Sequence, residues 1–466
     1  MNPRDLNRLV AHLKARYQKR TRKSLAVHHR AEKVMVRGGS HTLRLYYPYP
    51  FQIASAQGAW VKDVDGNAYL DYWQGHYANI LGHNPAAIRS ALKTPASRGS
   101  LHTGFESESQ IELAELIIRQ LGDGDLRVRF TTSGTLATMY AVMLALAHTG
   151  RDLVLKIGGG WHGASPFLLK GIRYDSRLGF HGPASAGIPQ EIFRRTLVTP
   201  FNDGQALENL LKRKGKSVAC FILEPFLGVG GFLPASREYL ELARRLTERY
   251  GIVLIFDEII SGFRFCPSGV QTLYGVRPDL STFGKLIGGG HTIAAVVGRR
   301  NILERCETRA NSRLRVLFEG GTFSSHPEYI RSGLAMLRTL IAQARQVYPR
   351  LAAQGESLRR GIEAAFRTEG VEAICTGNAE DVLPGSSMFM VHFPRRPWPA
   401  PSPEILADPH WADLSLREEV LKLALLVEGV HAVHGGGAVS TAHTAGQVRQ
   451  TLQAYAQTAR LFKKYL

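Results

Sequence analysis

The chain has 466 residues, of which 44% are hydrophobic and 21% charged, and its formal net charge is +19. This length is too great for one hydrophobic core, and the composition excludes a disordered or fibrous protein, so we expect a globular protein of two or three lobes. Neither an apolar run of about 18 residues nor CxxC or metal-like cysteine spacing occurs, so we expect a cytoplasmic protein without a transmembrane helix, disulfide or metal site.

The N-terminal segment, residues 1–74, begins with a basic arm. Its first 33 residues contain ten Lys or Arg and two acids. The apolar residues of this arm follow helical spacing and predict an amphipathic helix docked on the body: Leu6, Leu9, Val10, Leu13 and Tyr17. Contact with nucleic acid or an acidic partner is the less favoured interpretation. Residues 58–72 predict two short strands around an Asp-Gly turn.

From about residue 75 to 320, apolar strand-like runs alternate with helical patterns. The runs 153–157, 218–223 and 252–256 predict strands, and 237–250 predicts a helix. This alternation predicts a mainly parallel sheet covered by helices on both faces. Sheets of this kind place their functional sites at the carboxyl ends of the strands.

The remaining residues, 321–466, predict a smaller α+β unit. Residues 327–366 are largely helical in pattern, and 445–466 predict a closing helix. Strands are expected at 388–392 and 432–440. The proline-rich stretch 393–410 is expected to be an irregular loop.

The first motif suited to chemistry is the hydroxyl-rich turn Thr131–Thr135, which precedes a predicted helix at 136–146. The free backbone N–H groups and the positive dipole end of a helix start favour a bound phosphate. An ordinary helix N-cap, which also prefers Ser and Thr, is the alternative.

Two further motifs place an acid and a lysine at predicted strand ends. Asp257 follows the strand 252–256, where it suits a protonated ring nitrogen, although a strand-end Asp equally caps turns. Lys285 precedes Gly288–Gly290. Removal of its amine from water favours the neutral form, which makes a Schiff base with an aldehyde. Such a lysine alone indicates a surface cation, but the three motifs together indicate a cofactor site.

Nine segments occur in the order typical of one enzyme family: GAWVKDVDGNAYLDY, LGHNP, TTSGTLATM, GGWHG, ILEPFLGVGG, LIFDEIISGFR, PDLSTFGKLIGGG, GGTFSSHP and STAHT. Over residues 36–465 the chain resembles the class III aminotransferases, which are fold-type I pyridoxal-phosphate enzymes. It is most similar to their glutamate-1-semialdehyde 2,1-aminomutase branch. The resemblance implies an α/β fold with a mainly parallel seven-stranded sheet in a large domain (75–320) and a smaller α+β C-terminal domain (321–466).

The resemblance also implies a role for each matching residue. Lys285 is implied to hold pyridoxal 5'-phosphate as a Schiff base, with the pyridoxamine form arising during turnover, and Asp257 to keep the ring nitrogen protonated. Thr322 is implied to reach the phosphate in the neighbouring subunit of a homodimer. The other implied cofactor contacts are Ser133, Gly134 and Thr135 at the phosphate, Trp161 and Ile259 on the ring faces, and His162 and Glu224 beside the ring.

Some positions depart from the family pattern. Leu136 replaces a usual Glu, Ile260 a frequent Gln, and His326 a usual Asn. Members that bind carboxylates use an Arg after a Gly-Gly pair, which implies Arg44 as the substrate anchor. The spacing to Gly38-Gly39 is imperfect, so a surface cation is the alternative for Arg44.

The reaction is less defined than the cofactor. An aminomutase completes both half-reactions on one substrate, whereas an aminotransferase releases a keto product and takes a second partner. Aminomutases carry an acid near the position of His434, and none is present there. Together with Trp161 and Leu136, this favours an aminotransferase that moves an amino group from an amino-acid-like donor to a keto or aldehyde acceptor. The aminomutase is the alternative, and a non-catalytic ligand- or nucleic-acid-binding protein is a remote one.

Overall fold

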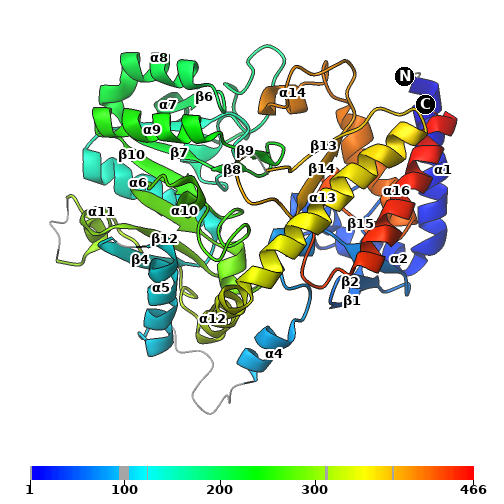
Figure 1. The fold of residues 1–466 in the computed structure, drawn as a ribbon, viewed down its shortest axis with the longest axis horizontal. Helices are drawn as coiled ribbons and strands as arrows, with labels where there is room; N and C mark the ends of the chain where they lie inside the picture. Colours follow the sequence, from blue (N-terminus) through cyan, green and yellow to red (C-terminus); the bar gives the residue numbers. More distant parts are fainter. Residues whose placement is uncertain (1–2, 94–103, 123, 310–312, 380–381, 466) are drawn as a thin grey trace.

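The computed structural model describes residues 3–93, 104–122, 124–309, 313–379 and 382–465. Its centre is a seven-stranded sheet (Figure 1). One strand, β12, is antiparallel to both of its neighbours, and the other neighbouring pairs are parallel. This confirms the predicted mainly parallel sheet. In spatial order the strands are β4 (Leu126–Thr131), β12 (Ala294–Arg299), β11 (Leu280–Phe283), β10 (Val253–Asp257), β7 (Val218–Leu223), β5 (Leu153–Ile157) and β6 (Thr196–Thr199).

Helices cover both faces of this sheet because alternate strand residues point to opposite sides. Ile222 and Ile255 pack with the buried face of α6 (Gly134–Thr149). Phe221 and Leu254 pack on the other side, with α8 (Gly204–Lys214) and α9 (Arg237–Tyr250). Since both faces of β7 and β10 are buried, these strands are apolar almost throughout, as the sequence indicates.

The C-terminal part consists of two long helices, a three-stranded sheet and a closing helix. Figure 1 shows α13 and α16 side by side. The predicted irregular loop 393–410 contains a short helix, α14 (Pro403–Ala407), which begins where the Ser402 hydroxyl accepts from the Ile405 N–H. The predicted strand 432–440 is shorter than expected, because Gly435, at a φ of 73°, turns the chain just before β16. The elements are α12 (Pro327–Ala342), α13 (Ala344–Thr368), β13 (Ile374–Thr376), β14 (Met388–His392), α15 (Leu421–Val427), β16 (Gly436–Ala438) and α16 (Ala445–Tyr465).

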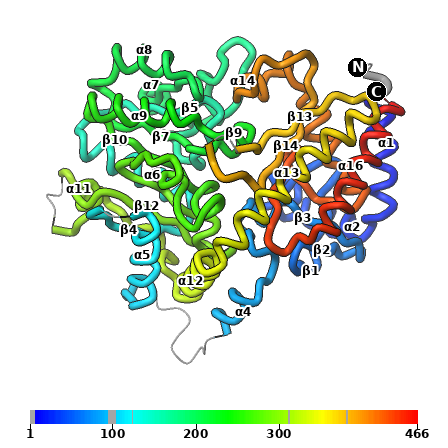
Figure 2. Tube along the Cα trace, viewed as in Figure 1, coloured from blue at the N-terminus to red at the C-terminus, as the bar shows by residue number. Residues whose placement is uncertain are grey.

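The basic arm forms α1 (Pro3–Arg20) and α2 (Arg22–Glu32). Figure 2 shows α1 beside α16, with the two ends of the chain close together. Leu9, Leu13 and Tyr17 are at most 1% exposed, which confirms the predicted docked amphipathic helix. The next strands form a four-stranded sheet: β1 (Ile53–Gln57), β2 (Trp60–Asp63), β3 (Ala68–Asp71) and β15 (Val430–His431).

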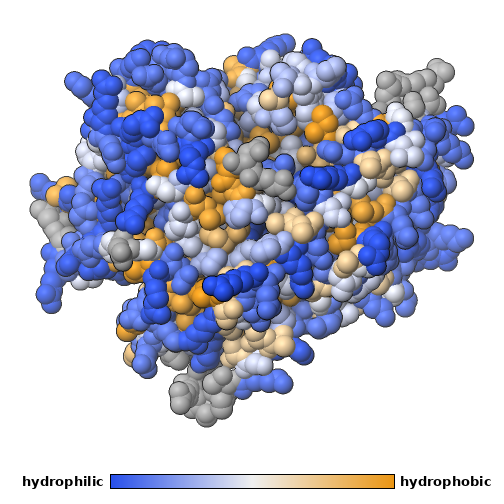
Figure 3. Space-filling model, viewed as in Figure 1, coloured by the Kyte–Doolittle hydropathy of each residue, from blue (hydrophilic) through white to orange (hydrophobic). Residues whose placement is uncertain are grey.

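Several further helices and a two-stranded sheet complete the described part of the chain. In the part of the chain that is described, no helix has the length and apolar character needed to span a membrane. Hydrophilic side chains cover most of the face in Figure 3, and apolar ones gather in small separate patches. The shorter elements are α3 (Gln74–Tyr77), α4 (Ala86–Leu92), α5 (Glu108–Leu121), α7 (Gln190–Arg195), β8 (Phe226–Leu227), β9 (Leu233–Pro234), α10 (Gln271–Tyr274) and α11 (Arg300–Leu303).

Candidate functional site

The acid and the lysine of the predicted site lie at the carboxyl ends of two adjacent parallel strands. Asp257 is the last residue of β10, and Thr282 of β11 is its partner in the strand register. Lys285 lies two residues after the end of β11 and begins the short 3-10 helix η6 (Lys285–Gly288), with Gly284 as its N-cap. The sheet therefore brings residues that are 28 positions apart in sequence to one edge.

Asp257 is buried, and both of its carboxyl oxygens take part in hydrogen bonds, with Oδ2 able to accept one more. One carboxyl oxygen, Oδ2, lies 2.8 Å from Nδ1 of His162. The other, Oδ1, accepts from the Thr282 hydroxyl and from the Ile259 N–H, both at 3.1 Å. Burial lowers the pKa of His162 despite the neighbouring acid, so its ring is neutral and Nδ1 donates. These three contacts fix the direction of the carboxyl group.

The Lys285 amine has a reduced basicity. Burial disfavours its charged form, whereas the charges of Asp257 and Glu224 favour it, and the net result lowers the pKa of Lys285 to about 8. A substantial fraction of the amine is therefore neutral near neutral pH. Lys285 has a φ of 45°, a left-handed conformation that is unfavourable for a side chain with a Cβ and is often found at functional positions.

The hydroxyl-rich turn lies against the same edge. Ser133 is the N-cap of α6, and its hydroxyl accepts from the Leu136 N–H at 3.3 Å. A Cβ added to Gly134 would lie 3.1 Å from the Ile259 side chain, and one added to Gly284 would lie 2.9 Å from it. Ile259 thus packs between the start of α6 and the backbone that precedes Lys285.

Glu224 holds the turn that carries Trp161. Its two carboxyl oxygens accept from the backbone N–H groups of Trp161 and Gly228, each at 3.0 Å. Burial and the charge of Asp257 raise the pKa of Glu224 above its usual range. The Trp161 side chain is 40% exposed, so its indole is free to receive a ring. Gly163 completes the turn, and a Cβ there would lie 2.5 Å from the Thr135 hydroxyl.

These residues fit pyridoxal 5'-phosphate. The first-turn N–H groups of α6 have no partners within the helix and suit a phosphate, and the small residue Gly134 keeps that surface open. A buried acid for the ring nitrogen ends β10, and an amine of lowered basicity begins η6, just after the neighbouring strand β11. His162 Nε2 is buried and has no hydrogen-bond partner among the described residues, which leaves it free for a ligand.

Thr322 and Arg44 lie at the periphery. Thr322 is exposed in a loop whose Gly320 carbonyl accepts from the Thr132 N–H, so it lies beside the phosphate turn of its own chain. Arg44 is exposed and donates to the Ser40 hydroxyl at 3.3 Å. The positive charges of Lys285 and Arg44 are both among the causes that lower the pKa of His76.

Sequence reasoning did not find another lysine of lowered basicity, Lys156, which is fully buried near the end of β5. Its ammonium donates to the carbonyls of Gly160, Leu168 and Lys170 at 2.8–3.1 Å. Burial lowers the pKa of Lys156 to about 7, below that of Lys285. The amine is nevertheless unavailable for chemistry, because its three donors are all used to hold residues 160–170. The one indication in the sequence is that a lysine interrupts the otherwise apolar run 153–157, which predicts a buried strand.

Sequence reasoning also missed the acid beside His434. Glu418, in the π-helical turn η8 (Leu416–Val420), lies 2.6 Å from His434 Nδ1 and accepts from Arg417 at 2.8 Å. These contacts hold the pKa of Glu418 well below its usual range, at about 2. An acid is thus supplied to this position from another segment, which no local motif reveals.

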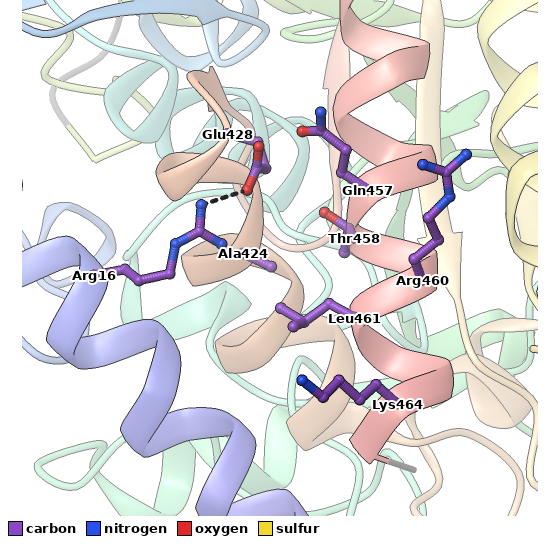
Figure 4. Close-up of a pocket in the computed structure, with 8 residues that line it drawn as sticks. All are labelled: Arg16, Ala424, Glu428, Gln457, Thr458, Arg460, Leu461 and Lys464. Atoms are coloured by element: carbon purple, nitrogen blue, oxygen red, sulfur yellow. Dashed lines mark hydrogen bonds and ion pairs between the residues drawn. The ribbon is translucent and has the colours of Figure 1, made fainter.

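A surface cavity of about 390 Å³ lies elsewhere. It is bounded by α1, α16 and the end of α15 (Figure 4). Arg16 and Glu428 form an ion pair at 2.9 Å within it. Its lining includes Arg460 and Lys464 but none of the residues of the candidate site, so it is not the catalytic centre.

The comparisons with known proteins agree on one family. The class III aminotransferase family model matches residues 44–374. The chain is 38% identical to the glutamate-1-semialdehyde 2,1-aminomutase of Methanothermobacter thermautotrophicus, over 80% of this chain and 84% of that protein. It is 33% identical to the Thermoplasma acidophilum enzyme of the same name, over 91% and 96%.

Among solved structures, an omega-transaminase from Sphaerobacter thermophilus matches with a TM-score of 0.82 and 31% identity, covering 94% of this chain and 97% of that one. These matches confirm the family indicated by the nine motifs. The chain is a member of the class III aminotransferase family, with the fold-type I architecture and the pyridoxal 5'-phosphate cofactor of that family.

Proposed function

We propose that the protein is a glutamate-1-semialdehyde 2,1-aminomutase, which converts glutamate-1-semialdehyde to 5-aminolevulinate without a second amino partner. The observation that carries this proposal is the 33% identity to an enzyme of that name over 91% of the chain. The comparisons support this alternative better than the aminotransferase that the sequence favours.

Glu418 removes one argument against the aminomutase. The absence of an acid at His434 favours an aminotransferase only if no other segment supplies one. Glu418 lies 2.6 Å from the His434 ring, so the His434 position has a partly exposed carboxylate partner. The acid is therefore compatible with an aminomutase, although it is attached to a different part of the backbone.

The roles of the residues follow from their geometry. When bound, pyridoxal phosphate withdraws electrons from the substrate carbon that carries the amino group. Asp257, held by His162 and Thr282, binds the ring nitrogen, and the first turn of α6 binds the phosphate. The Lys285 amine is free to take a proton from one substrate carbon and return it to the next, because its lowered basicity suits both directions.

An aminotransferase is the second candidate function, favoured by the 31% identity to the Sphaerobacter thermophilus omega-transaminase. The two reactions use the same core residues and differ in whether a keto product leaves. Purified protein loaded with the pyridoxamine form of the cofactor and given only glutamate-1-semialdehyde should form 5-aminolevulinate over many turnovers. Consumption of one equivalent of the aldehyde with release of 4,5-diaminopentanoate and no 5-aminolevulinate, resumed when an amino donor is added, would instead identify an aminotransferase.

Arg44 is proposed to bind the substrate carboxylate. Replacing it with glutamine should raise KM for glutamate-1-semialdehyde about 10–100-fold, the effect of losing one charged hydrogen bond, with kcat little changed. Arg30→Gln is the matched control, since Arg30 is exposed on α2. Steady-state kinetics of both variants give the result, and an Arg44→Gln enzyme with the KM of the control would assign Arg44 to the surface.

The pKa of about 8 for Lys285 predicts how fast the apoprotein captures its cofactor. Only a neutral amine attacks an aldehyde, so the rate of covalent attachment should rise about tenfold per pH unit below pH 8 and level off above it. The visible absorbance that appears on adding pyridoxal phosphate measures this rate. A rise that continues to about pH 10 would mean that Lys285 has the basicity of an ordinary lysine.

A homodimer is also proposed. Three apolar side chains near Thr322 are exposed in the single chain, namely Leu314 (51%), Leu317 (61%) and Phe323 (51%), and a second subunit would cover them.

A division into residues 1–74, 75–320 and 321–466 is proposed because every strand of the seven-stranded sheet lies between residues 126 and 299. A cytoplasmic location remains a prediction from the sequence.

A further inference from the structure

We propose that His76 determines specificity by donating a hydrogen bond to a carbonyl or carboxylate oxygen of the substrate beside Lys285. The proposal rests on the proposed function, because it requires a substrate bound at the Lys285 amine. None of the motifs indicated His76.

The backbone that carries His76 is strained. The four residues of α3 all have positive φ: Gln74 at 46°, Gly75 at 59°, His76 at 60° and Tyr77 at 67°. A left-handed conformation costs roughly 1–2 kcal/mol for each residue that has a Cβ. Three such residues within one turn of four persist only where the surroundings fix them, and such strain concentrates at functional positions.

A buried acid fixes this turn. The carboxyl oxygens of Asp71 accept from the backbone N–H groups of Trp73 and Gln74, each at 3.0 Å. Two imidazoles hold Asp71 in turn, His83 at 2.7 Å and His431 at 2.8 Å. Because His431 belongs to β15, the turn is anchored to both the N-terminal and the C-terminal parts of the chain.

The turn places the His76 ring at the site. α3 contacts both η6, which begins with Lys285, and β16. The His76 ring lies 4.3 Å from the Trp73 ring and 5.3 Å from the His41 ring, measured between centroids. Its Nε2 is buried and has no hydrogen-bond partner within the described part of the chain. An unpartnered polar atom in such a place is unfavourable unless a ligand satisfies it.

The charges around His76 define what it binds. Burial and the positive charges of Lys285, His41 and Arg44 lower its pKa to about 4, so the ring is neutral at neutral pH. A neutral imidazole that donates from one nitrogen suits an oxygen acceptor. Since the positive charge of Arg44 also acts on this ring, the surroundings fit an amine that also carries acidic or carbonyl oxygens.

Two variants separate this role from packing. His76→Phe keeps an aromatic ring against Trp73 but removes both nitrogens. His76→Asn keeps a hydrogen-bond donor on a residue that tolerates the left-handed conformation. His29→Phe, at an exposed position of α2, is the control. Each protein is loaded with pyridoxal phosphate, and loss of its visible band is timed after adding either 5-aminolevulinate or pentylamine, which lacks both oxygens.

For His76→Phe, reaction with 5-aminolevulinate should slow about 10–100-fold while pentylamine reacts at the rate of the unmodified protein. His76→Asn should recover part of the loss, and cofactor content and Tm should not change. If both amines react with His76→Phe at the rates of the unmodified protein, the role of His76 is overturned and the proposed function stands. Loss of cofactor, or slowing by the same factor with both amines, assigns His76 to packing. If the unmodified protein reacts with pentylamine but not with 5-aminolevulinate, or with neither, the proposed function fails as well.

Discussion

Replacing Lys285 with alanine is expected to abolish covalent attachment of the cofactor and to reduce turnover by at least about 10²–10⁴-fold, the contribution of a positioned acid–base group. The Lys285 amine lies after β11, at the edge of the sheet where Asp257 ends β10. No other described lysine combines this location with a lowered pKa. Turnover of glutamate-1-semialdehyde and the visible spectrum of the variant measure the effect.

Lys156 provides the control for this substitution. Its pKa is lowered further than that of Lys285, so basicity alone would select it as the reactive amine. Its three hydrogen bonds to carbonyls instead predict that Lys156→Met lowers Tm and loosens residues 160–170 but leaves the cofactor attached at Lys285. Near-normal turnover in Lys285→Ala would refute the assigned role of Lys285.

Replacing Asp257 with asparagine is expected to weaken cofactor binding about 10–100-fold, since the ring nitrogen loses a charged hydrogen-bond partner. The kcat should also fall by about 10²-fold, because a neutral amide does not stabilise a protonated ring. Asparagine keeps one oxygen for the Thr282 hydroxyl and the Ile259 N–H, and its NH2 group then faces His162 Nδ1, which has to accept instead of donate. Equilibrium titration with pyridoxal phosphate and steady-state kinetics provide the two values.

Glu258 is the matched control for Asp257. It is the next residue and also a buried acid, but it accepts from the backbone N–H groups of Val270 and Gln271 and does not contact the site. Glu258→Gln should therefore reduce Tm and leave the cofactor affinity unchanged. An Asp257→Asn enzyme with unmodified kinetics would show that another group protonates the ring.

Much of the fold was predictable because its signals are local. The helix 237–250 agrees with α9 at both ends, where the Ser236 hydroxyl accepts from the Tyr239 N–H and Gly251 adopts a φ of 62°. The apolar runs that form β7 and β10 are recognisable because both their faces are buried. Once these strands are predicted, Asp257 and Lys285 are expected to lie close together, because parallel strands have their carboxyl ends at the same edge of the sheet.

The remaining parts of the site depend on long-range packing. His76 lies on a left-handed turn that contacts η6 and is anchored by Asp71 and His431, and these last two residues are 360 positions apart. Glu418 reaches His434 from a π-helical turn of the C-terminal part. Such contacts have no spacing or periodicity that reveals them in one sequence. The substrate pocket was therefore less predictable than the cofactor site.

The most direct test of the account is to identify the lysine that carries the cofactor. The protein loaded with pyridoxal phosphate is reduced with borohydride, digested and analysed by mass spectrometry. The account predicts one phosphopyridoxyl group for each chain, on the peptide that contains Lys285. A label on Lys156, or an unlabelled Lys285 in protein that retains cofactor, would contradict it.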